Sequence, residues 1–70
     1  MRVSTTDFEF AHGRPPRGQG QWAFYFGHGR RSGMCVDPWF CPGNVLYSVA
    51  KKAAVAEARS RGFTWVEVGS

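Results

Sequence analysis

Four residues of this chain have side chains that can bind a transition metal: His12, His28, Cys35 and Cys41. Structural zinc sites usually place paired ligands two to four residues apart, whereas five residues separate the two cysteines here. Each histidine is next to a glycine, in a context where an imidazole commonly hydrogen-bonds to backbone. We therefore expect no metal and no cofactor, and we interpret the cysteines as reduced thiols.

Nucleophilic catalysis is the other chemistry to consider. A nucleophile needs a base and an orienting acid, and the sequence around Cys41, between Phe40 and Pro42, offers neither. The acidic residues are scattered, apart from Asp7 and Glu9, whose spacing suits one solvated face of a strand. No glycine-rich phosphate-binding loop opens a helix. The sequence thus predicts a binding protein and not an enzyme.

Arginine and aromatic side chains are the strongest functional signal. They cluster in residues 12–31, around an aromatic strand, and a tryptophan near the end of the chain extends the set. Arginine binds phosphate and carboxylate groups, and Trp, Tyr and Arg serve both base stacking and protein hot spots. The candidate binding residues are Arg14, Arg17, Tyr25, Arg30, Arg31 and Trp65. The alternative is that the two aromatic residues pack on each other and on the loop of residues 12–20 and close a small second core.

Length and charge set further limits. Seventy residues make one domain, residues 1–70, with too little core for a deep catalytic cavity. The net charge of +4 and the pI of about 9.7 favour an anionic partner such as nucleic acid, although solubility explains them as well. Neither a membrane-spanning run nor a signal segment is evident. We expect a cytoplasmic protein without membrane contact.

The first half of the chain is predicted to form strands joined by a long loop. Residues 6–11 alternate apolar and acidic side chains, which predicts a half-buried strand. Residues 12–20 contain glycines and a proline pair and form a loop. Residues 21–26 form a second strand, with Trp22, Phe24 and Phe26 on one face. Residues 34–36 are a candidate third strand.

The second half is predicted to hold one helix and one strand. The helix covers residues 45–61, begins at an Asn44 cap and stops at Gly62. Residues 63–68 form the last strand, with Val66 and Val68 toward the core if Glu67 and Trp65 point to water. The helix stripe expected to be buried is Leu46, Val49, Ala50, Ala53 and Ala54.

These elements define an α+β fold: a small antiparallel sheet of three to four strands with one helix packed on one face, in the order β-β-(β)-α-β. One helix covers only one side of such a sheet. The other side, carrying Tyr25 and Trp65, is then left for solvent or a partner.

Two segments carry a family resemblance. The run R-G-Q-G-Q-W-A-F-Y-F, followed by Y-S-V-A-K-K-A-A-V-A-E-A, is similar in layout to the arm-type DNA-binding domains of phage integrases. That resemblance implies a sheet that enters the DNA major groove. In its size and its lack of catalytic motifs the chain also resembles short phage and mobile-element proteins of the anti-CRISPR type, which act by occupying a surface of a nuclease complex.

The leading hypothesis is a non-enzymatic inhibitor from a phage or mobile element that docks on a host defence protein or nucleoprotein complex, for example a CRISPR effector. The alternative is a DNA- or RNA-binding accessory module that uses the same residues on phosphates and bases. A third hypothesis is a homodimer, in place of a monomer, that buries Tyr25 and Trp65 against their symmetry mates.

Overall fold

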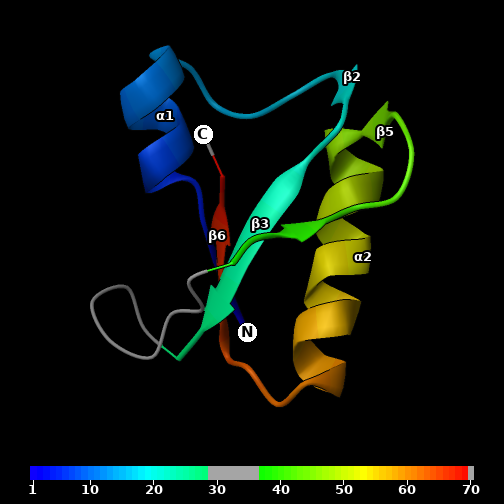
Figure 1. The fold of residues 1–70 in the computed structure, drawn as a ribbon. Helices are drawn as coiled ribbons and strands as arrows, with labels where there is room; N and C mark the ends of the chain where they lie inside the picture. The colour runs from blue at the N-terminus through cyan, green and yellow to red at the C-terminus, as the bar shows by residue number, and fades with distance from the viewer. Residues whose placement is uncertain (29–36, 70) are drawn as a thin grey trace.

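A mixed sheet flanked by two helices is the framework of the protein (Figure 1). The computed structural model describes residues 1–28 and 37–69. The strands lie in the order β1 (Arg2–Ser4), β6 (Trp65–Val68), β3 (Ala23–Gly27) and β4 (Trp39–Phe40). Strands β3, β4 and β6 pair antiparallel, whereas β1 runs parallel to β6. The α+β class is therefore confirmed, and the parallel edge strand is a feature that the alternation pattern did not predict.

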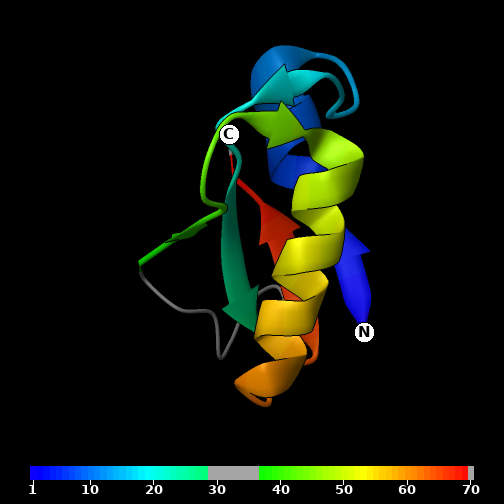
Figure 2. The ribbon, with the colours of Figure 1, turned by 90° about the vertical axis from the view of Figure 1, so that its right-hand side faces the viewer.

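A second, two-stranded sheet leads into the long helix. Strand β2 (Gln19–Gly20) pairs antiparallel with β5 (Val45–Leu46), and α2 (Tyr47–Ser60) follows directly. Helix α2 runs along one face of the main sheet, as Figure 2 shows. Because Leu46 belongs to β5, the residue that precedes the helix is Leu46 and not the predicted Asn44, and no side chain caps this end.

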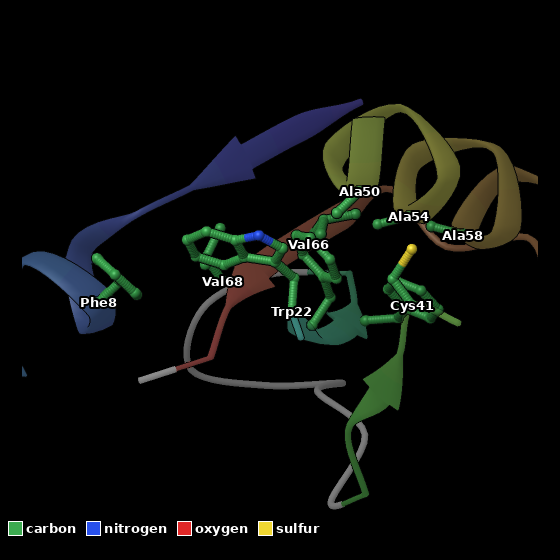
Figure 3. Packing of buried hydrophobic residues seen from close by; sticks show 10 residues of the cluster. Phe8, Trp22, Cys41, Ala50, Ala54, Ala58, Val66 and Val68 are labelled. Atoms are coloured by element: carbon green, nitrogen blue, oxygen red, sulfur yellow. The ribbon is translucent and has the colours of Figure 1, made fainter. Parts of the chain in front are cut away.

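The core lies between α2 and the sheet (Figure 3). Phe24, Phe26, Val66 and Val68 project from β3 and β6 to the α2 side and are buried. Alanines at every fourth position of α2 meet them, so the helix axis approaches large sheet side chains closely. Trp22, Phe24 and Phe26, predicted to share one face of a strand, are all buried.

The helix stripe itself was predicted only in part. Ala50 and Ala54 are buried as expected, and Ala58 completes the stripe. Leu46 and Val49, expected in the same stripe, are about half exposed. The reason is geometric: residues four apart repeat on one face of a helix, whereas Val49 is rotated about 100° from Ala50 and Leu46 is not helical.

Residues 6–11 form a helix and not the predicted strand. Helix α1 (Thr6–His12) buries Phe8 and leaves Phe10 93% exposed. The alternation of Phe with acidic residues therefore does not correspond to the two faces of a strand. Acidic side chains in the first turn favour the positive end of a helix, and the Thr5 hydroxyl donates a hydrogen bond to the Glu9 carboxylate. Gly13, at φ 69°, ends the helix in the left-handed conformation.

Helix α1 lies on the opposite side of the sheet from α2, near the C-terminal end of β6 (Figure 1). The sheet therefore has helices on both faces, and the predicted bare face is partly covered. The candidate strand at residues 34–36 lies outside the described residues.

Trp22 joins the small sheet, α1 and α2. Its indole Nε1 donates a hydrogen bond to the Val45 carbonyl oxygen at 3.1 Å. Its ring lies 5.6 Å from Phe8 and 5.0 Å from Tyr47, measured between centroids. The ring of Tyr47 is partly buried in this contact, and burial raises the pKa of its hydroxyl.

Enlarging an α2 alanine tests the close approach of helix and sheet. We expect Ala54→Leu to lower the free energy of unfolding by about 1–3 kcal/mol, because the added atoms meet packed sheet side chains. The exposed Ala56→Leu is the matched control and should change it by less than about 0.5 kcal/mol. Urea denaturation measures both, and equal effects of the two substitutions would contradict this packing.

The raised pKa of Tyr47 predicts a loss of stability at alkaline pH. The unfolded chain releases the hydroxyl proton near pH 10 and the folded chain only at higher pH. The contribution of Tyr47 is therefore complete below about pH 10 and declines as pH rises toward the folded-state pKa. The difference in unfolding free energy between wild type and Tyr47→Phe should be constant below pH 10 and shift against wild type above it. A difference that stays constant through alkaline pH would refute the assignment.

Candidate functional site

A hollow of about 440 Å³ lies where α1, the small sheet and β4 meet at one end of the main sheet. This volume is within the range of small-ligand sites, about 300–1,000 Å³. It is lined by Phe8, His12, Arg14, Arg17, Gln19, Gly20, Gln21, Trp22, Ala23, Phe40 and Gly69. We refer to it as the arginine hollow.

Aromatic rings form the walls of the arginine hollow. Phe8 and Trp22 line it and belong to the buried core (Figure 3). His12 lies over Phe8 with the ring centroids 4.3 Å apart. Phe40, which pairs with Ala23 across β4 and β3, is 64% exposed. The hollow thus combines one exposed ring, Phe40, with the buried rings of Phe8 and Trp22.

Two exposed arginines stand at its rim. Arg14 and Arg17 are separated by two prolines, and Pro16 is buried whereas Pro15 is exposed. Proline fixes φ near −65°, so the segment between the guanidinium groups has few conformations. Within residues 1–28 and 37–69, neither guanidinium has a hydrogen bond or an ion pair. Both remain able to bind an anion.

The polar lining carries no negative charge. The lining residues include no Asp or Glu, and the side chains of Gln19 and Gln21 supply amide groups. Gln19 Nε2 donates to the Asn44 carbonyl oxygen at 3.3 Å, and among residues 1–28 and 37–69 its amide oxygen has no donor. Positive charge, amide groups and a flat ring suit a ligand that is both planar and anionic.

The predicted binding residues fall in separate places. Arg14 and Arg17 line the hollow, as expected of a binding loop. Tyr25 lies two residues beyond Ala23 on β3, and Trp65 lies opposite Gly27 on β6; neither lines the hollow. Arg30 and Arg31 are outside the described residues.

Glu67 explains why the face of Tyr25 and Trp65 is not bare. The alternation of side chains along residues 63–68 predicted that Glu67 points to water, but its side chain is 2% exposed. Its Oε2 accepts from the Ser4 hydroxyl at 3.0 Å and from the Asp7 backbone N–H at 3.3 Å. The carboxylate therefore links β1, β6 and the first turn of α1, and the chain covers its own sheet here.

Trp65 is engaged in the same network. Its Nε1 lies 3.4 Å from Glu67 Oε1, which accepts its hydrogen bond, and the Arg2 guanidinium carbon is 5.2 Å from the ring centroid. Trp65 and Tyr25 are both partly buried. Trp65 therefore packs against its own chain through Arg2 and Glu67, which are not the partners of the alternative predicted from the sequence, Tyr25 and the loop of residues 12–20.

Sequence reasoning missed His12, Gln19, Gln21 and Phe40 as members of the site. The pairing of Phe40 with Ala23 was the missing information, because β4 is only two residues long and its register is not visible in a pattern. His12 was interpreted as a turn residue, whereas it ends α1. The proximity of Arg14 and Arg17, by contrast, could be inferred from the loop that holds both.

The other chemistry-bearing residues are dispersed. The thiol of Cys41 is buried, and its Sγ lies 3.9 Å from the Pro42 carbonyl oxygen. Cys35 lies outside the described residues. Over residues 1–28 and 37–69, no three His, Cys, Asp or Glu side chains gather closely enough to hold a metal ion.

No family model, curated protein or solved structure matches this chain. In the part of the chain that the structure describes, neither helix has the length and apolar character to cross a membrane.

Removing the buried carboxylate tests its role in holding α1. We expect Glu67→Ala to lower the free energy of unfolding by about 1–3 kcal/mol, because three donors, on Ser4, Asp7 and Trp65, lose a buried acceptor. Hydrogen exchange of the α1 amides should accelerate in this variant. Glu57→Ala, which breaks an ion pair on the α2 surface, is the control and should cost about 0–1 kcal/mol. Unchanged α1 exchange in Glu67→Ala would rule out the linkage.

Proposed function

We propose that this chain is a non-enzymatic binding protein that docks on a host nucleoprotein complex in the cytoplasm, as an anti-CRISPR-type inhibitor does, and that the arginine hollow is its contact site. The observation that carries the proposal is the pair of exposed guanidinium groups beside an open aromatic ring, with no acidic partner among the described residues. Charged groups left unpaired at a rim contribute encounter rate and orientation.

The exposed apolar side chains around this site supply docking surface. Phe40 stands at the hollow, and Phe10 projects from α1 almost completely exposed. Large exposed rings on an ordered framework are characteristic of contact surfaces, where aromatic and arginine anchors provide most of the binding energy. The buried thiol of Cys41 is not presented to a substrate, which fits binding in preference to nucleophilic chemistry.

An accessory module that binds DNA or RNA directly is the second candidate. The net charge of +4 favours it, because neutralising phosphates releases counterions and strengthens binding. It differs from the first candidate in requiring no protein component. A homodimer requires neither partner and places the exposed rings of two copies together.

Replacing both arginines tests the site. We expect Arg14→Ala/Arg17→Ala to lose a partner that tagged wild type captures from a bacterial lysate, because the two cations at the hollow are removed. Lys51→Ala/Lys52→Ala is the matched control: it removes equal charge from the outer face of α2 and should retain the partner. Capture is quantified with and without nuclease, so that a nucleoprotein, a free nucleic acid and a protein are separated.

Three results would count against the proposal. Equal capture by both double variants would show attraction by net charge alone. A dimer mass from light scattering, combined with no captured partner, would favour self-association. Failure of wild type to restore plaque formation by a phage targeted by the captured complex would exclude the inhibitor role.

A further inference from the structure

We propose that the arginine hollow binds one nucleotide of a single-stranded nucleic acid, with the base on the open face of Phe40 and the phosphate held by Arg14 and Arg17; this inference rests on the proposed function and names the component of the partner that occupies the site.

Phe40 presents an exposed ring at the edge of the arginine hollow. Phe40 is 64% exposed, and it borders the hollow together with the nearly buried rings of Phe8 and Trp22. Stacking needs only one open ring face and is tolerant of base identity. An apolar side chain from a protein partner gains most of its binding energy when it is enclosed and desolvated. An open ring at the edge of a hollow therefore fits a base better than it fits a peptide anchor.

The two cations of the hollow are spaced to suit one phosphate or two neighbouring ones. A proline pair favours the polyproline II conformation, which has three residues per turn and a rise of about 3.1 Å per residue. Arg14 and Arg17 are three residues apart, which is the spacing at which this conformation repeats a side chain on one side of a segment, over about 9 Å. Both side chains line the hollow. Two long guanidinium side chains over that span can converge on one phosphate group or contact neighbouring ones.

Two side-chain amide groups accompany the cations and the ring. Gln19 and Gln21 line the same hollow as the arginines and the ring. A side-chain amide offers both a donor and an acceptor to the edge of a base. Gln19 Nε2 already donates to the Asn44 carbonyl oxygen, so the acceptor of this side chain is the group that it can offer to a ligand. The site therefore combines an anion contact, an amide and a stacking surface in one place.

Charge elsewhere gives an internal comparison. Lys51, Lys52 and Arg59 form a second cationic surface on α2, lined otherwise by Ser48, Val55 and Ala56. This surface has no aromatic ring, so it can attract phosphates but cannot stack a base. If net charge alone attracted the nucleic acid, the arginine hollow and this surface would contribute equally to its affinity.

The test is binding of a labelled oligothymidine and of an abasic strand of equal length, followed by fluorescence anisotropy over a range of salt concentrations. Wild type should bind oligothymidine at least about tenfold more tightly than the abasic strand. Phe40→Ala should remove most of that difference and Phe40→Trp should retain it. Arg14→Ala/Arg17→Ala should weaken binding of both strands and reduce the salt slope by about 0.7 for each phosphate that the variant no longer neutralises, whereas Lys51→Ala/Lys52→Ala should preserve the preference for oligothymidine.

Equal affinity for the two strands, or an unchanged preference in Phe40→Ala, would overturn the inference. So would equal weakening of binding in the two double variants. If wild type binds neither strand but still captures a nuclease-resistant partner through Arg14 and Arg17, the occupant is a protein surface: the inference fails and the docking function stands. If wild type captures no partner either, both the nucleotide-binding inference and the proposed docking function fail.

Discussion

Contact between the alanine face of α2 and the large side chains of β3 and β6 is the constraint on which the rest of the structure depends. Phe24, Val66 and Val68 are fully buried, and α2 meets them with methyl groups. Because small side chains let the helix approach, most of the buried volume is contributed by the sheet. A chain of this length buries only about 60% of its unfolded surface, so a few large, well-packed side chains must supply much of its stability. The direction of β3, and hence the position of the hollow at its start, follows from this packing.

Helix α1 depends on a different interaction. It buries one ring, Phe8, and its first turn donates a backbone N–H to Glu67. A helix of seven residues is too short to be stable alone, so tertiary contacts must hold it. Since Phe8 and His12 line the arginine hollow, the buried carboxylate on one part of the sheet helps to position a wall of the site on another. Stability and the candidate site are thus coupled through α1.

The parts that could be predicted from the sequence are those where one physical rule dominates. The alternation of side chains identified the buried face of β3, a strand that pairs on both edges, with β6 and with β4. Helix propensity identified most of α2. The rule failed at residues 6–11, where alternating apolar and acidic residues also fit an acidic first helical turn, and the tertiary contact with Glu67 decides between them. The alternation along the last strand also predicted wrongly that Glu67 points to water, because the sequence pattern does not show that α1 covers this face.

The same distinction applies to the candidate site. Arg14 and Arg17 share one loop, so their proximity is encoded locally, whereas Phe40 reaches the hollow through a strand pairing between residues 17 positions apart. The local part also carries a consequence for binding. Ordering a flexible side chain or loop on association costs free energy, and a segment restricted in advance avoids part of that cost. Pro15 and Pro16 lie between the two arginines, and Pro16 is buried, so the backbone that carries the arginines is restricted. The lysines of α2 lie on a helix, and no aromatic ring lines the surface around them. For equal charge, the hollow is therefore the better organised of the two cationic surfaces for holding a ligand in one orientation.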